Sequence, residues 1–270
     1  MHTDDTPILV LGGTGKTGRR VAERLTTRGV NVRIGSRAAS PPFHWNDPAT
    51  WPAALHGVRG AYVSYYPDLA APGAPEAVGA LARTAAEAGV ERLVLLSGRG
   101  EEEAQRSEEV VREAMPAATI LRCSWFAQNF TEGALAPDVL AGELALPVGD
   151  TREPFVDVED IADAAVAALC DDGHAGQLYE ITGPRLLSFE EAVGELSAMS
   201  GRQVAFRRVP MEEFRAQLAA IELPEQEIAL LAYLFGEVMD GRNERIADGI
   251  QRALGRQPRD FADHARAWAP

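Results

Sequence analysis

The feature that most constrains this chain is an apolar run that ends in closely spaced glycines. Residues 8–11 are an uninterrupted aliphatic run, which is typical of a parallel strand buried on both faces. Gly12, Gly15 and Gly18 follow at regular intervals, and a helical pattern of apolar residues begins after them. A strand, a glycine turn and a helix in this order predict the first segment of a Rossmann-type fold.

The glycines of this turn have separate physical tasks. The first permits a tight turn, the second lets backbone N–H groups approach a pyrophosphate, and the third lets the helix pack closely. The helix N-terminus adds unpaired donors and a positive dipole. A turn without a ligand is the alternative, whereas a mononucleotide P-loop is rejected because Val10 stands where that motif needs a glycine. The predicted cofactor-binding residues of the turn are Gly12, Gly13, Thr14, Gly15, Lys16, Thr17 and Gly18.

The end of the second predicted strand, at residues 31–34, indicates which dinucleotide binds. An NAD-binding fold carries an acidic residue there for the ribose hydroxyls. This chain instead has Ser36, which leaves room, and Arg37, which can pair with a 2′-phosphate as a planar cation with several donors. The pattern therefore favours NADPH over NADH, and an arginine that is merely solvated is the alternative.

Strand and helix patterns alternate through the first two thirds of the chain. Predicted strands at 60–66, 92–97 and 118–122 are separated by predicted helices, which indicates an α/β fold with a doubly wound parallel sheet. From about residue 184 helical patterns dominate, so we expect a Rossmann domain over 1–183 and a smaller, mostly helical C-terminal lobe over 184–270. The helices expected in this lobe cover 189–199, 211–220, 224–239, 246–254 and 260–268, with one strand near 204–207.

Composition narrows the class of protein further. The 270 residues carry a formal net charge of −14, which argues against a surface that binds nucleic acid directly. The acidic N-terminus does not look like a signal peptide, and no apolar run is long enough to span a membrane, so a cytoplasmic protein is expected. Cys123 and Cys170 show no metal-binding or disulfide spacing, and no metal is predicted. A small-molecule substrate is the expected partner, with a monomer and a homodimer both left open.

Ligands of such sheets bind beyond the carboxyl ends of the strands. Tyr65, Tyr66 and Ser97 lie at two of these ends and are the candidate catalytic residues, with Ser97 also a candidate cofactor contact. Tyrosine hydroxyls can orient a substrate oxygen while the rings stack on a planar acceptor. Residues with an ordinary core role are the alternative for all the aromatics. The predicted substrate pocket adds Trp125, Phe126 and Phe155.

Several stretches together resemble a known family. They are the glycine turn at 12–18, residues 119–130 with the letters TILRCSWFAQNF, residues 155–162 with FVDVEDIA, and residues 179–184 with YEITGP. They are similar to the NmrA-like branch of the atypical short-chain dehydrogenases/reductases, from residue 7 to about 266. Within this branch the chain looks closest to NAD(P)H:quinone oxidoreductase, triphenylmethane reductase and festuclavine synthase relatives. The resemblance implies dinucleotide binding and places Asn129 in the substrate pocket.

One departure from the broader superfamily bears on the chemistry. A typical member carries Tyr-x-x-x-Lys on the helix after the strand that ends at Ser97, and residues 101–109 contain neither tyrosine nor lysine. The usual general acid for carbonyl reduction is therefore missing. Hydride transfer to an electron-poor or cationic acceptor, such as a quinone, an iminium or a dye, requires little proton donation. The sequence predicts an NADPH-dependent reductase of such molecules; a non-catalytic NADP(H) sensor and an isomerase or cyclase with a structural cofactor are the alternatives.

Overall fold

The computed structural model describes residues 6–133 and 135–268. The chain divides into two compact units, which we call the sheet unit and the second unit. The single boundary expected at residue 183 lies near one of the crossings between them, and the domain division itself stays a prediction. The sheet unit comprises Met1–Cys123, Val158–Ile181 and Asp248–Arg256, and the second unit comprises Ser124–Asp157, Thr182–Ala247 and Gln257–Pro270.

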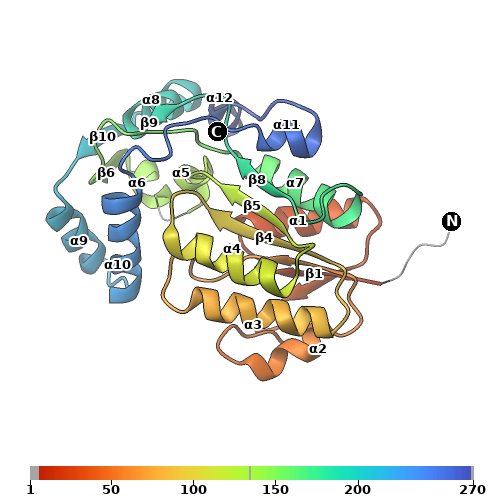
Figure 1. The fold of residues 1–270 in the computed structure, drawn as a ribbon. Helices are drawn as coiled ribbons and strands as arrows, with labels where there is room; N and C mark the ends of the chain where they lie inside the picture. The colour runs from red at the N-terminus through yellow and green to blue at the C-terminus, as the bar shows by residue number, and fades with distance from the viewer. Residues whose placement is uncertain (1–5, 134, 269–270) are drawn as a thin grey trace. The chain divides into compact units, whose positions relative to one another are not determined.

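The sheet unit is built on six parallel strands in the order β2-β1-β3-β4-β5-β8 (Figure 1). From β1 the chain adds β2 on one side and then β3 on the other, so the strand order reverses beside β1. This arrangement confirms the predicted α/β, Rossmann-type doubly wound parallel sheet. The strands are β1 Ile8–Leu11, β2 Val32–Gly35, β3 Gly60–Val63, β4 Arg92–Gly98, β5 Thr119–Cys123 and β8 Leu178–Ile181.

The third strand is shorter than the sequence predicts. Pairing of β3 with β1 ends at Tyr62, opposite Val10, and pairing with β4 ends at Val63. The prediction that the strand extends through Tyr66 is wrong. The chain turns away after β1 at Gly12, where φ is +69°, so β1 offers no further backbone groups with which β3 could pair. Tyr65 and Tyr66 therefore lie on a loop beyond the carboxyl end of the strand.

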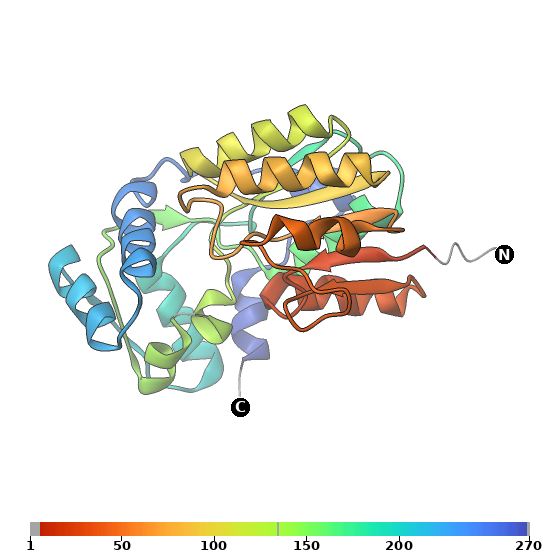
Figure 2. The same ribbon diagram turned by 90° about the horizontal axis from the view of Figure 1, so that it is seen from below.

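Helices cover both faces of this sheet. Figures 1 and 2 show α3 and α4 together on one face and α1 on the other, where α1 packs against α7. The short helix α2 follows a 3₁₀ turn at Pro48–Thr50 and packs beside α3. The helices are α1 Lys16–Thr27, α2 Trp51–Leu55, α3 Ala74–Glu87, α4 Glu102–Ala114, α7 Val158–Cys170 and α11 Gly249–Leu254.

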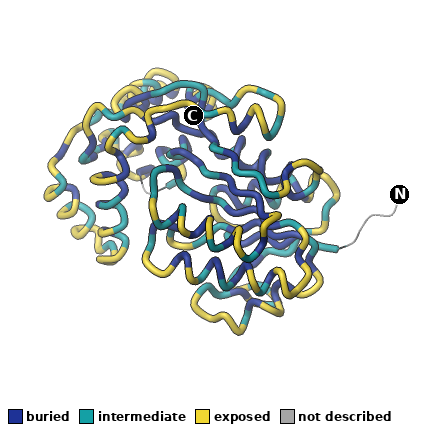
Figure 3. Tube along the Cα trace, in the orientation of Figure 1, coloured by how far each residue is buried: buried dark blue, intermediate teal, exposed yellow. Residues whose placement is uncertain are grey.

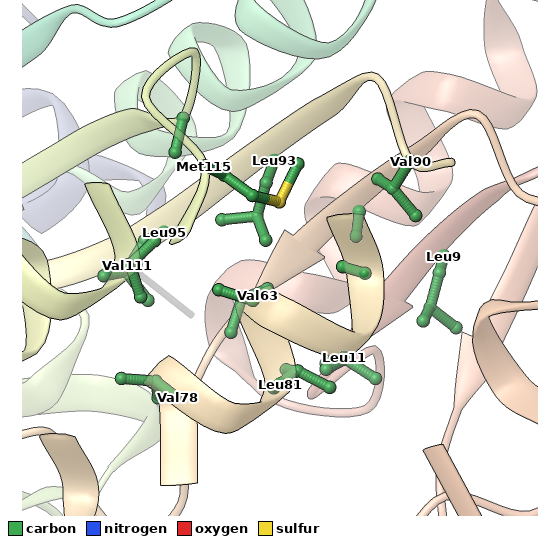
Figure 4. Packing of buried hydrophobic residues seen from close by; sticks show 14 of the residues in the cluster. Leu9, Leu11, Val63, Val78, Leu81, Val90, Leu93, Leu95, Val111 and Met115 are labelled. Carbon is green, nitrogen blue, oxygen red and sulfur yellow. The ribbon is translucent and has the colours of Figure 1, made fainter. Parts of the chain in front are cut away.

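A continuous apolar core joins the sheet to α3 and α4 (Figure 4). Leu9 and Leu11 of β1, Leu95 of β4 and Leu81 of α3 are at most 1% exposed. Each such side chain contributes roughly 1.5–3 kcal/mol relative to an exposed one. The central strands β1 and β3 are buried along their whole length, as expected from their apolar sequences, and Figure 3 shows the dark blue of buried residues through the middle of the sheet.

The second unit contains more strand than predicted. Its helices are α5 Asn129–Glu132, α6 Ala136–Ala141, α8 Phe189–Ser200, α9 Met211–Ala220, α10 Glu225–Tyr233 with a π-helical turn at Leu234–Val238, and α12 Phe261–Ala267. Two small sheets join them: β6 Glu143–Leu146 pairs in parallel with β10 Ala205–Arg208, and β7 Arg152–Glu153 pairs antiparallel with β9 Leu187–Ser188. The helix expected from residue 246 begins at Gly249 and belongs to the sheet unit.

Candidate dinucleotide site

The glycine turn connects β1 to α1 through a tight backbone reversal. Gly12 has a φ of +69°, in the left-handed region that favours glycine, and its carbonyl oxygen accepts a hydrogen bond of 2.8 Å from the Gly15 N–H. The helix α1 begins at Lys16 with Gly15 as its N-cap. Thr14 and Gly15 are exposed. The turn thus presents backbone and a helix N-terminus to solvent, which is the arrangement that binds phosphate groups.

Two other glycines of the turn are required by close packing. A Cβ on Gly18 would overlap the carbonyl oxygen of Gly12, closer than real Cβ atoms approach. A Cβ on Gly13 would lie 2.8 Å from the Cδ1 atom of Ile34 on β2. Gly18 therefore lets α1 pack directly on the turn, and Gly13 lets the turn pack on the second strand. These are the tasks that the motif assigns to its glycines.

The end of β2 carries the residues predicted to select the cofactor. The Ser36 carbonyl accepts hydrogen bonds from the N–H groups of Ala39, at 3.2 Å, and Phe43, at 2.9 Å, so the following loop folds back on it. Arg37 is exposed, and within residues 6–133 and 135–268 it has no hydrogen bond or ion pair. No acidic residue occupies 35–37. The guanidinium is available to an anionic ligand.

The two tyrosines beyond β3 differ in their surroundings. The ring of Tyr65 lies edge-on to that of Trp45, with centroids 4.7 Å apart, and Trp45 contacts Phe43 at 5.1 Å. Burial, with a smaller contribution from the charge of Glu76, raises the pKa of Tyr65. Tyr66 is 70% exposed. Tyr65 is therefore packed on the segment that follows β2, whereas the Tyr66 ring is open to solvent; their catalytic roles stay predictions.

Ser97 lies near the end of β4 with its hydroxyl already engaged. It is buried, and its Oγ donates a 2.6 Å hydrogen bond to the Oε1 atom of Glu108 on α4. Arg122 of β5 donates to the same oxygen through Nε at 2.8 Å and also pairs with the other oxygen of Glu108. This buried network ties α4 to two strands. A contact of Ser97 with cofactor or substrate stays a prediction.

The remaining predicted pocket residues belong to the second unit. Trp125 is half-buried, with ring centroids 5.0 Å from Phe235 and 5.9 Å from Phe189. Phe155 is 2% exposed and packs on Phe189 at 5.2 Å, so it is part of an aromatic core. Phe126 and Asn129, the last two predicted pocket residues, are joined by the backbone. The N–H of Asn129, the first residue of α5, donates a 3.0 Å hydrogen bond to the carbonyl of Phe126. Their substrate-pocket role stays a prediction.

Sequence reasoning missed the contribution of residues far from any motif. Trp45 lies in the segment after β2, and its contact with Tyr65 joins residues that are distant along the chain. Glu108 lies on α4 among several other acidic residues, and it is only 3% exposed. Ala104 and Val111 are apolar and share a helix face with Glu108. This helical spacing is the sequence signal that could have placed Glu108 on the inner face of α4.

Residues 6–133 and 135–268 contain neither a candidate metal site nor a helix that could span a membrane. No group of three or more His, Cys, Asp or Glu side chains among residues 6–133 and 135–268 could hold a metal ion. Within the same residues, no helix has the length and apolar character needed to cross a bilayer. Cys123 is a buried free thiol whose pKa is raised by its burial, and Cys170 is a half-buried one.

A parallel sheet whose order reverses beside a glycine turn and a helix N-terminus defines the class, a protein with a Rossmann-type fold. The NmrA-like family matches residues 4–263 of the chain, which is nearly its whole length. The chain belongs to the NmrA-like family.

A curated relative agrees with this membership, and solved structures agree with the fold. The NAD(P)H azoreductase of Xenophilus azovorans is 30% identical over 286 residues, covering 97% of this chain and 98% of the relative. The structure of the Escherichia coli NADPH-dependent quinone oxidoreductase QOR2 complexed with NADPH has a TM-score of 0.79 at 21% identity, covering 96% and 99% of the two chains. That of the Citrobacter triphenylmethane reductase complexed with NADP(H) has a TM-score of 0.73 at 21% identity, with the same coverage.

Proposed function

We propose that this chain is an NADPH-dependent reductase that transfers hydride to a conjugated or cationic small molecule. The observation that carries the proposal is the combination of an open glycine turn with an exposed, unpaired Arg37 at the end of β2, within the described residues. Oxidoreductases among the relatives and structural neighbours, named for azo, quinone and triphenylmethane substrates, support a general reductase role.

The residues of the sheet unit fit the cofactor. The exposed backbone of the turn would bind the pyrophosphate at the N-terminus of α1. Arg37 would bind the 2′-phosphate through charge-assisted hydrogen bonds, and Ser36 leaves room beside it. When bound, NADPH supplies the hydride.

The missing tyrosine and lysine restrict the acceptor. The helix α4 begins at Glu102 and carries neither residue where the wider superfamily has its general acid. An acceptor that is already electron-poor or cationic takes a hydride with little help from a proton donor. Tyr66, with its exposed ring, would stack on such a planar molecule, and its hydroxyl would orient an oxygen of the acceptor.

The test is NADPH oxidation by the purified protein against quinones, iminium compounds and cationic dyes, beside calorimetric titrations with NADPH, NADP⁺ and NADH. We expect turnover with at least one acceptor and tighter binding of NADPH than of NADH. Equal affinity for the two reduced cofactors would contradict the assignment of Arg37. Absence of turnover across the whole panel would count against the reductase.

A non-catalytic sensor of NADP(H) is the second candidate. It is favoured by the Ser97 hydroxyl, which is committed to Glu108 inside the sheet unit and provides no evident catalytic group at the end of β4. A sensor would bind NADP⁺ and NADPH selectively and with different affinities, without oxidising NADPH in the presence of any acceptor. The same titrations and assays therefore separate the two candidates.

A further inference from the structure

Trp45 and Tyr65 bring two loops of the sheet unit together at its carboxyl edge. Trp45 lies on the loop that follows β2, and Tyr65 lies on the loop that follows β3. Their rings meet edge-on, with centroids 4.7 Å apart. Because β2 and β3 pair with opposite sides of β1, these two loops flank the end of β1, where the glycine turn begins. The aromatic pair therefore belongs to the same edge as the predicted phosphate-binding turn.

Buried neighbours fix the position of Trp45. Phe43 is 4% exposed and Trp51 is 2% exposed, and the Trp45 ring contacts both, with centroid distances of 5.1 Å and 6.1 Å. The indole N–H of Trp51 donates a 2.8 Å hydrogen bond to the carbonyl of His44, the residue before Trp45. The loop is thus attached to α2 by its backbone and its rings. A ligand that contacts Trp45 would not have to order this side chain first.

Trp45 and Tyr65 keep part of their own surface exposed. Both are half-buried, and both pack against the apolar core that joins the sheet to α3 and α4. Their ring planes are inclined at 68° to one another. A flat base that stacked on one ring would therefore meet the other ring with its edge, which is a favourable aromatic arrangement. Rigid, partly exposed aromatic rings are the surfaces on which proteins stack bases.

The backbone brings this pair close to the residues predicted to recognise the 2′-phosphate. The Phe43 N–H donates a 2.9 Å hydrogen bond to the Ser36 carbonyl, so the loop returns to the end of β2 two residues before Trp45. Arg37, which follows Ser36, is exposed. In NADPH the 2′-phosphate and the adenine are substituents of one ribose. Binding of the phosphate by Arg37 would bring the adenine to this same loop.

We propose that Trp45 and Tyr65 bind the adenine base of the dinucleotide, so that Tyr65 serves the cofactor and not the acceptor. The inference rests on the NADPH-dependent function proposed above. It separates the two tyrosines that the sequence groups together: the Tyr65 ring contacts the adenosine half of the cofactor, and Tyr66 remains on the acceptor side.

The acidity of Tyr65 is consistent with this assignment. Burial raises the pKa of its hydroxyl, and the charge of Glu76 raises it further. A general acid works best when its pKa lies near the working pH, so this shift disfavours proton donation by Tyr65. Contacts made by its ring do not depend on the proton.

One half of the cofactor provides the decisive experiment. The compound 2′,5′-ADP carries the adenine, the ribose and the 2′-phosphate, but no nicotinamide. Trp45→Leu and Tyr65→Leu remove the rings, whereas Tyr65→Phe keeps a ring without the hydroxyl. Tyr66→Leu is the matched control, because Tyr66 is the next residue of the same loop and its ring is 70% exposed.

We expect Trp45→Leu and Tyr65→Leu each to weaken the binding of 2′,5′-ADP and of NADPH by roughly 10-fold in calorimetric titrations, since each removes a stacking surface. Tyr65→Phe and Tyr66→Leu should bind 2′,5′-ADP as the wild type does. A loss in Tyr65→Phe as large as that in Tyr65→Leu would assign the contact to the hydroxyl and overturn the proposal. Equal losses in Tyr65→Leu and Tyr66→Leu would also overturn it.

Tryptophan fluorescence tests the proposal without removing a ring. Saturating 2′,5′-ADP should change the emission of the wild type, and Trp45→Phe should lose this change while it keeps an aromatic surface. Trp268→Phe is the control, because Trp268 is also half-buried but belongs to the second unit, and it should keep the change. An emission change that persists in Trp45→Phe would contradict the assignment of Trp45.

The titrations also distinguish failure of this inference from failure of the proposed function. A wild-type protein that binds neither NADPH nor 2′,5′-ADP would refute the proposed function, and the adenine site with it. Binding of both compounds, with affinities that Trp45→Leu and Tyr65→Leu leave unchanged, would refute the adenine site alone.

Discussion

The two edges of the parallel sheet in the sheet unit use polar residues in opposite ways. At the carboxyl edge Arg37 is exposed and has no partner within the described residues. The backbone of the glycine turn is exposed at Thr14 and Gly15. This edge leaves hydrogen-bond donors available.

At the amino edge the polar groups satisfy one another. The hydroxyl of Thr119 donates to the His174 carbonyl at 2.7 Å, and the Nδ1 atom of His174 lies 2.9 Å from the Tyr179 hydroxyl in a second hydrogen bond. Arg92 donates to the carbonyl of Asp171 at 2.6 Å. The comparison indicates that substitutions at the amino edge will change stability, whereas those at the carboxyl edge will change ligand binding and turnover.

The largest effect is expected at the glycine turn. Gly18→Val would force the side chain into the carbonyl oxygen of Gly12, so the turn or α1 must move. We expect NADPH affinity to fall by more than 100-fold, about 3 kcal/mol, as overpacking distorts the phosphate-binding backbone. Calorimetric titration measures it. Gly194→Ala on α8 is the control, because outside its own stretch of helix no atom lies within 4 Å of the added Cβ, and it should bind as wild type. Normal NADPH binding by Gly18→Val would refute the turn as the cofactor site.

The next effect concerns the choice between cofactors. Arg37→Glu replaces an unpaired cation with an anion, and we expect NADPH affinity to fall by about 2–3 kcal/mol, since a charge-assisted contact is lost and repulsion is added. NADH has no 2′-phosphate, so its Kd should change little. Titration of both cofactors checks this, with the exposed Arg83→Glu as a control for net charge. A parallel loss for NADH would mean that Arg37 does not read the 2′-phosphate.

A smaller effect is expected at the amino edge. Tyr179→Phe removes the hydroxyl that bonds to His174, and we expect the free energy of unfolding to fall by about 1 kcal/mol. Urea denaturation provides the measurement. The Kd for NADPH should be unchanged in the folded protein. A weaker cofactor affinity with unchanged stability would break the proposed division between the two edges.

The smallest effect is expected for an exposed ion pair at the same edge. Arg92 pairs with Asp172 at 2.6 Å, but the Asp172 side chain is 99% exposed. Solvent screens such a pair, so Asp172→Asn should leave the urea midpoint and the Kd for NADPH unchanged. A clear loss of stability would show that the amino edge depends on its surface charges as well as on its buried hydrogen bonds.

Local features of the site could be predicted from the sequence, and non-local ones could not. The turn between β1 and α1 depends on neighbouring residues, so the spacing of Gly12, Gly15 and Gly18 was sufficient to predict it. The alternating patterns also predicted the parallel sheet. The contact of Tyr65 with Trp45 depends on where two loops from different strands meet, and no periodic pattern records such a meeting.

Residues that act through packing were equally hard to anticipate. The carboxyl group of Glu101 lies where a Cβ on Gly98 would be, which a single sequence does not reveal. The engagement of Ser97 with Glu108 depends on which face of α4 meets the sheet. In the second unit, the pairing of β6 with β10 joins segments that are separated by five other elements.

The return of the chain to the sheet unit at α11 has a consequence for biosynthesis. Gly249 lies directly against the backbone of Glu180 on β8, and Arg256 donates hydrogen bonds to Asp160 at 2.7 Å and Asp163 at 2.6 Å. Asp160 is fully buried, and a buried carboxylate that lacks its guanidinium partner is strongly destabilising. Asp160 is synthesised 96 residues before Arg256. The nascent chain therefore cannot complete the sheet unit until Asp248–Arg256 have been synthesised, after the intervening residues of the second unit.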